Sequence, residues 1–172
     1  MIRILVLAGA VLAAGAWAAS EPSRFTDKQL EARFSYDLGA DSVDVSGYPK
    51  AQQENYKVFS EVCSRCHTLA RPINSPLASR ADWKRFIARM HARTKNMAGA
   101  DFTKEQAKAV VDFLAYDSGI RKVREKKSFE AETARLKSLF AEVRAERARV
   151  NAESDARKAK PYGDQMPAQP RP

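Results

Sequence analysis

Two cysteines and a histidine stand close together in the chain, in the order Cys63, Cys66 and His67. Cys63 and Cys66 are the only cysteines in the sequence. Residues three and four apart share one face of a helix, so both thiols and the imidazole can converge on one flat object. Two thiols can add to the vinyl groups of a haem while the histidine binds its iron. This C-x-x-C-H spacing is a signature of c-type haem attachment.

Three other roles for these residues need weighing. A disulfide between Cys63 and Cys66 is common chemistry in exported proteins, but so short a gap makes a strained bridge that constrains little chain. A thioredoxin-like redox pair expects a β-α-β pattern, and no convincing strand lies near the motif. Zinc expects a fourth ligand, and the only other histidine is His91. We therefore favour covalent haem, and a single motif predicts one haem.

The first 18 residues have the pattern of a secretory signal peptide. Arg3 precedes an apolar run from Ile4 to Trp17, and the small-residue pattern Ala16-Trp17-Ala18 follows. The run is shorter than the ~20 apolar residues of a spanning helix. We expect cleavage after residue 18 and an exported protein, which in a bacterium means the periplasm. An uncleaved membrane anchor is the alternative.

The composition predicts an all-α fold with a modest core. The chain is 44% hydrophobic and 30% charged, with seven glycines and few runs of valine or isoleucine. We expect an N-terminal arm at 19–47, a small helical domain around one haem at 48–119, a charged amphipathic helix at 120–160 and a disordered tail at 161–172. We expect one helix from Thr26 to about Phe34 and a second from about Ala51 into the haem motif. Two more helices should follow a cap formed by Ser79 and Asp82, and Thr103. Leu69–Ser79 is expected to be a loop, and Gly119 a break or kink.

The predicted C-terminal helix carries a narrow apolar stripe on a basic background. Residues 121–160 contain 13 Lys/Arg against 7 Asp/Glu, which supplies +6 of the net charge of +9. The stripe repeats every seven residues. Acidic residues stand where a coiled coil would need its second apolar seam, so we expect the stripe to pack against the haem domain of the same chain. The stripe consists of Phe129, Leu136, Val143 and Val150.

The residues from Tyr48 to Gly119 resemble a monohaem class I-type cytochrome c. The order of haem motif, loop, aromatic-bearing helix and terminal helix is similar to that family. The resemblance implies that Phe59, four residues before the first cysteine, and Leu69, which follows the histidine, contact the haem. The family usually has a glycine at the position of Asn55, so the crossing of the first and last helices must be looser or differently built here. The family's aromatic residue near the end of the last helix corresponds to Phe113 or Tyr116.

A methionine is the expected sixth ligand to the iron, because thioether sulfur favours ferrous iron and raises the reduction potential. Met90 lies seven residues after Trp83, and a subset of the family has a similar W-x6-M arrangement that presents the sulfur from a helix. We therefore predict that Met90 is the ligand and that Trp83 belongs to the haem site. Met97, in the following loop, is the alternative, and His91 is a third candidate.

His67 is the other predicted ligand of the haem iron. Its ring N–H needs an acceptor to fix the ring. The loop offers two prolines that could place a backbone carbonyl there, and these are Pro72 and Pro76.

These features together predict a single-electron carrier that is not an enzyme. With two histidines, one of them bound to iron, general acid–base chemistry has little material. The alternatives are a haem-based gas-binding or sensor protein with a labile sixth ligand, and a subunit docked into a larger redox complex. The basic charge favours acidic redox partner proteins or an anionic membrane surface. We expect no nucleic-acid binding and a monomer.

Overall fold

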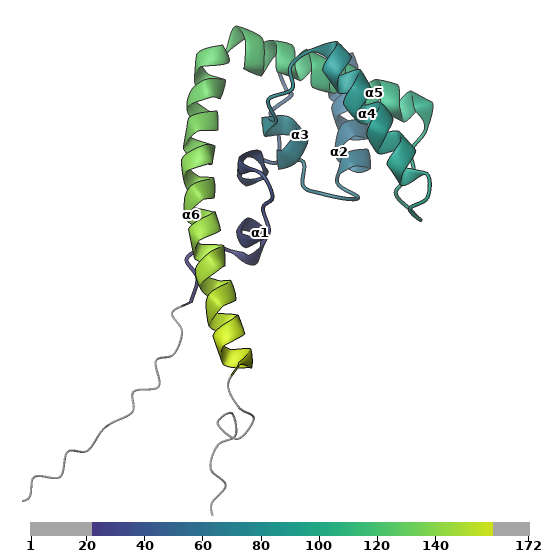
Figure 1. The fold of residues 1–172 in the computed structure, drawn as a ribbon. Coiled ribbons are helices and arrows are strands. Elements are labelled where there is room, and N and C mark those ends of the chain that lie inside the picture. The colour runs from purple at the N-terminus through teal and green to yellow at the C-terminus, as the bar shows by residue number, and fades with distance from the viewer. Residues whose placement is uncertain (1–21, 160–172) are drawn as a thin grey trace, which may run out of the picture.

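The computed structural model describes residues 22–159, and this part of the chain is built from helices and loops without a strand (Figure 1). The all-α prediction is confirmed. The predicted signal peptide at 1–18 and the predicted disordered tail at 161–172 lie outside the described residues. None of the helices in the described part combines the length and apolar character needed to cross a membrane.

Three helices form the main core. α2 (Lys50–Cys63) and α4 (Arg80–Thr94) both pack on α5 (Lys104–Ser118). The largest side chains of this core are fully buried, and the rings of Phe59 and Phe113 lie 5.0 Å apart between centroids. Burying aromatic rings of this size is the main source of stability in a core this small. The fully buried core side chains of these helices are Phe59, Trp83, Val110, Phe113 and Leu114.

Side-chain caps start three of the helices where the sequence predicts them. The hydroxyl of Ser79 accepts a hydrogen bond from the backbone N–H of Asp82 at the start of α4. Thr103 forms a capping box with Gln106 at the start of α5. Thr26 forms the same motif ahead of α1 (Asp27–Leu30). Such caps satisfy backbone groups that a helix end would otherwise leave unpaired.

Two local predictions are wrong in detail. α1 ends at Leu30 and does not reach Phe34. The expected loop Leu69–Ser79 contains a short helix, α3 (Ala70–Asn74). Pro72 does not prevent this helix, because it stands in the first turn, where its missing N–H has no intrahelical partner to lose.

The last two helices are nearly continuous with α5. At Gly119 the α-helix changes into a π-helix, η2 (Gly119–Arg124), in which the N–H of Glu125 donates to the carbonyl of Ile120 at 3.0 Å. The chain is therefore not broken at Gly119. It turns at Glu125 and enters the long helix α6 (Lys126–Lys158), which runs away from the core (Figure 1).

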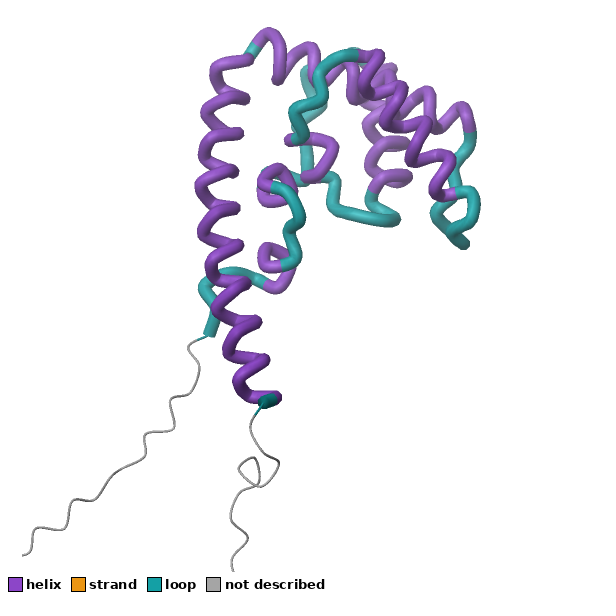
Figure 2. The backbone as a smooth tube through the Cα atoms, viewed as in Figure 1, coloured by secondary structure: helices purple, strands orange, loops and turns teal. Residues whose placement is uncertain are grey.

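The apolar stripe of α6 is covered by the N-terminal arm. Leu136 and Val143 are 2% and 0% exposed, while Phe129 and Val150 are half-buried. The elements that pack along α6 are α1 and η1 (Ser35–Leu38), as the tube in Figure 2 also shows. The expectation that the stripe packs against the predicted haem domain is thus wrong. The heptad spacing places the stripe on one side of the helix but does not say which distant segment reaches it.

One glycine makes the junction between the arm and the core possible. A Cβ atom on Gly39, directly after η1, would lie 2.5 Å from the side chain of Asn74. The amide of Asn74 uses this close approach to donate to the carbonyl of Ala40 at 2.8 Å. The arm is therefore tied to the end of α3 by a contact that only glycine permits.

Candidate functional site

An apolar pocket between α2, α4 and α5 contains the residues that the sequence singles out for chemistry. The empty space among its lining side chains, including the part open to solvent, is about 540 Å³. The side chains of Cys63, Cys66, His67 and Met90 all line it. The remaining lining residues are Val62, Pro72, Phe86, Ile87, Thr94, Ala100, Phe102 and Val110.

The end of α2 places the two thiols. Cys63 is the last residue of the helix and is half-buried, whereas Cys66 follows in a turn and is exposed. Both thiols are free. Burial, and to a smaller extent the neighbouring Cys66, raises the pKa of Cys63 to about 12. A thioredoxin-like nucleophile needs a lowered thiol pKa, so this environment argues against that role.

The imidazole of His67 is held in an orientation that suits a metal ligand. Its Nδ1 lies 3.0 Å from the backbone carbonyl oxygen of Thr68. A neutral ring that donates from Nδ1 leaves the lone pair of Nε2 free to bind a metal. The acceptor is thus the adjacent residue and not Pro72 or Pro76. The carbonyl of Pro72 instead accepts from the hydroxyl of Ser75 at 3.1 Å.

The two methionines have different surroundings. Met90 projects from α4 into the pocket and is half-buried. Met97 lies in the loop after α4 with 49% of its surface exposed, and it does not line the pocket. His91 also stays outside the lining. Its ring packs edge-on against Phe102, and its Nδ1 is buried without a hydrogen-bond partner. Of the three candidates for a sixth ligand, only Met90 shares the pocket with His67.

The three side chains predicted to contact a haem beside the thiols do not line the pocket. Phe59 is fully buried against Phe113, and Trp83 is fully buried with its indole N–H donating to the hydroxyl of Ser118 at 3.0 Å. Leu69 is half-buried and packs against the same core. Trp83 supports the pocket lining through Phe86, whose ring meets it edge-on at 6.1 Å.

Sequence reasoning missed part of the lining. Thr94, Ala100 and Phe102 close the pocket from the end of α4 and from the loop before α5. Phe102 and Ala100 are buried although they lie in a loop. The signal available was the apolar residue just before the cap Thr103, which often packs against the helix that it precedes.

The pocket brings together the side chains of two cysteines, a histidine and a methionine. These are the residue types that thioether attachment and axial ligation of a haem would use. Within residues 22–159, no group of three or more His, Cys, Asp or Glu side chains is arranged to hold a metal ion by itself.

No protein-family model, curated protein or solved structure matches this chain. The resemblance to class I-type cytochromes c therefore depends on the sequence motifs alone.

Proposed function

We propose that this protein is a single-electron carrier that holds one c-type haem in the pocket between α2, α4 and α5. The observation that carries the proposal is that Cys63, Cys66, His67 and Met90 line the same apolar pocket. The apolar N-terminal segment supports export, so we place the carrier in the periplasm.

In this proposal the thiols of Cys63 and Cys66 would attach the haem, and His67 and Met90 would bind its iron. A haem bound in this way supplies an iron that alternates between the ferric and ferrous states and exchanges single electrons with other proteins. The residues of the chain orient it and control its surroundings. The contact between His67 and the carbonyl of Thr68 fixes the imidazole ring, and such contacts raise the basicity of the ligand.

The apolar lining controls access of water. Ile87 is 5% exposed, Val110 1% and Phe102 9%, so this side of the pocket is dry. A dry, weakly polar surrounding disfavours the ferric form, which carries more charge, and soft thioether sulfur from Met90 acts in the same direction. We therefore expect a coordinatively saturated site with a raised reduction potential.

Basic side chains on the outer side of α4 favour an acidic redox partner. Arg85, Arg89 and Arg93 are exposed and spaced by four residues, so they form one ridge beside the pocket residues Phe86 and Met90. Arg85 pairs with Asp82, while the guanidinium of Arg89 lies 5.5 Å from the centroid of the Phe86 ring. A basic ridge beside an electron-transfer site steers acidic redox proteins, and an anionic membrane surface would be attracted in the same way.

The visible spectrum of the purified full-length protein tests the proposal. After reduction we expect the sharp bands of low-spin c-type haem, unchanged by carbon monoxide because Met90 occupies the sixth position. A spectrum that carbon monoxide alters immediately would favour a gas-binding or sensor protein. A colourless protein from an expression host that attaches haem to other C-x-x-C-H proteins would contradict the proposal.

A further inference from the structure

The segment Leu69–Ser79 borders the pocket and is held by two residues of the π-helix η2. This segment follows the predicted ligand His67 and contributes Pro72 to the pocket lining. At the end of α3, the carbonyl oxygen of Ile73 accepts a hydrogen bond from the guanidinium of Arg121 at 2.8 Å. Carbonyls at a helix C-terminus lack intrahelical donors and attract a cation, so this contact fixes the end of α3.

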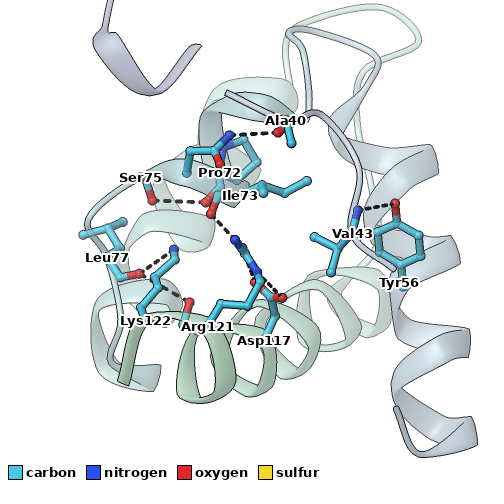
Figure 3. Close-up of polar contacts among 12 residues, drawn as sticks. Ala40, Val43, Tyr56, Pro72, Ile73, Ser75, Leu77, Asp117, Arg121 and Lys122 are labelled. Carbon is cyan, nitrogen blue, oxygen red and sulfur yellow. Dashed lines mark hydrogen bonds and ion pairs between the residues drawn. The ribbon is translucent and has the colours of Figure 1, made fainter. Parts of the chain in front are cut away.

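The next residue of η2 holds the same segment at a second point. The Nζ atom of Lys122 donates to the carbonyl oxygen of Leu77 at 2.9 Å (Figure 3). Arg121 and Lys122 are adjacent on the π-helix, and both reach the segment. One of the two bonds holds a carbonyl of α3, and the other holds a carbonyl of the connection between α3 and α4.

Arg121 is itself fixed by a buried carboxylate. Asp117 is 0% exposed and pairs with the guanidinium through contacts of 2.8 and 2.6 Å. The phenol of Tyr48 donates to the same carboxylate at 3.0 Å. Arg121 therefore holds Ile73 from a fixed position and does not move freely as a surface side chain would.

Lys122 occupies an aromatic cage that an apolar residue could fill. It is 7% exposed, and its Nζ lies 5.0 Å from the centroid of the Trp83 ring and 5.5 Å from that of Phe129 in α6. Burial lowers the pKa of Lys122 to about 7, with Arg121 adding to the shift and Asp117 opposing it. Burying an amine is costly unless it makes a specific bond. The bond to Leu77 is the specific gain that lysine provides and a methionine would not.

We propose that Arg121 and Lys122 are positioning residues for the haem pocket, because they hold the Ile73 and Leu77 carbonyls and so fix the segment that carries Pro72. This inference rests on the proposed function for its effect on the haem, but the hold on the segment exists in the bare chain as well. Through Phe129, the same lysine links the segment to α6.

The test uses the full-length protein and three variants. Lys122→Met keeps the length and apolar stem but removes the donor, and Lys122→Arg keeps a donor and a charge. Lys127→Met is the matched control, because Lys127 is exposed. In the haem-loaded protein we expect Lys122→Met to shift the midpoint reduction potential and the band that marks sulfur ligation of ferric iron. Lys122→Arg should restore both at least in part, and Lys127→Met should change neither. A Lys122→Met protein that melts earlier but keeps the wild-type potential and band would overturn the inference.

A second readout does not need haem and separates this inference from the proposed function. In the full-length thiol form, alkylation of Cys63 reports opening of the pocket, while exposed Cys66 serves as the internal reference. Losing this hydrogen bond should raise the alkylation rate of Cys63 by roughly 3- to 10-fold in Lys122→Met. An unchanged rate would overturn the positioning role even if the wild type proved to bind no haem. Should Lys122→Met fail to accumulate, Arg121→Lys, which loses the forked contact with Asp117, carries the same two readouts.

Discussion

The two ends of this molecule are built in different ways. The pocket region of α2, α4 and α5 has a continuous aromatic core around Phe59, Trp83 and Phe113. In the second region, which we call the arm region, α6 packs against α1 and η1 of the N-terminal arm. Leu136 and Val143 of α6 are deeply buried in this contact. Because this contact is narrow, most backbone hydrogen bonds of the arm region lie near solvent. The arm region should therefore open at a lower free energy than the pocket region.

The polar contacts differ in the same way. The arm region is held at its edge by pairs such as Arg24–Glu142, whose side chains are 66% and 48% exposed. The junction near the pocket instead uses the buried pair Asp117–Arg121, with 1% and 23% exposed. Exposed pairs contribute about 0–1 kcal/mol, whereas breaking a buried pair costs about 3–5 kcal/mol. The comparison therefore predicts that the buried pair resists opening more than the exposed edge of the arm region does. Where η1 meets α3, the N-terminal arm also has a buried pair, Asp37–Arg71, with 7% and 29% exposed.

Removing both thiols should have the largest effect on the pocket region. In Cys63→Ala/Cys66→Ala we expect no covalent haem and a lower yield of protein, because the pocket would lose the apolar group proposed to fill it. Haem staining of a denaturing gel together with the yield of soluble protein measures this. Ser64→Ala, an exposed change in the same turn, should keep both haem and yield. Normal haem retention in the double variant would show that the thiols do not attach it.

Replacing the predicted sixth ligand should change the iron site and leave the fold intact. Met90→Leu preserves volume, so its cost in stability should stay below about 1.5 kcal/mol. We expect the ferric sulfur-ligation band to vanish and the reduction potential to fall. Met97→Leu, at the exposed loop position, is the control and should keep the band. The opposite pattern would assign the ligand to Met97 and its loop.

The arm region should lose stability without changing the pocket. Leu136→Ala removes a deeply buried side chain from the contact between α6 and the N-terminal arm and should cost about 2–5 kcal/mol of local stability. Hydrogen exchange should become faster in residues 126–158, while the haem spectrum stays at the wild-type form. Lys137→Ala, at the neighbouring exposed position, should leave exchange unchanged. A spectrum that changes together with the arm region would show that the two regions are one cooperative unit.

The pH dependence of stability gives a smaller effect at the junction. Burial lowers the pKa of Lys122 to about 7, from an ordinary value of 10.5. Above about pH 7 the unfolded chain holds a proton that the folded chain has lost, so the free energy of unfolding should rise with pH. Between about pH 7 and about pH 9 this contribution is on the order of 1 kcal/mol per unit. Denaturant unfolding of Lys122→Met should lack this rise, and parallel curves for the two proteins would contradict the assignment.

Local signals in the sequence predicted much of the fold. The caps at Thr26, Ser79 and Thr103 lie within three residues of the groups that they satisfy, so the sequence is sufficient to find them. The apolar spacing that puts Trp83 and Met90 on one face of α4 is also local, and Met90 does line the pocket with the C-x-x-C-H residues.

Local signals did not predict the contacts between segments that are distant in the sequence. The stripe of α6 identified Leu136 and Val143 but not the arm that covers them, because η1 has no matching pattern of its own. Lys122 belongs to a run of charged residues that ordinarily lies in solvent. In the folded chain its Nζ atom lies instead over the rings of Trp83 and Phe129. Pro72 reads as a loop residue, and its tolerance in the first turn of α3 depends on its exact place in the helix.

The most direct test of the central claim is whether the haem is covalently attached to Cys63 and Cys66. Extraction of the purified, full-length protein with acidified acetone removes haem that is bound only through its iron. We predict that the colour stays with the precipitated protein and that the peptide containing residues 63–67 carries the added mass of haem. Haem that passes into the acetone, or a haem-free peptide with two unmodified thiols, would contradict the account.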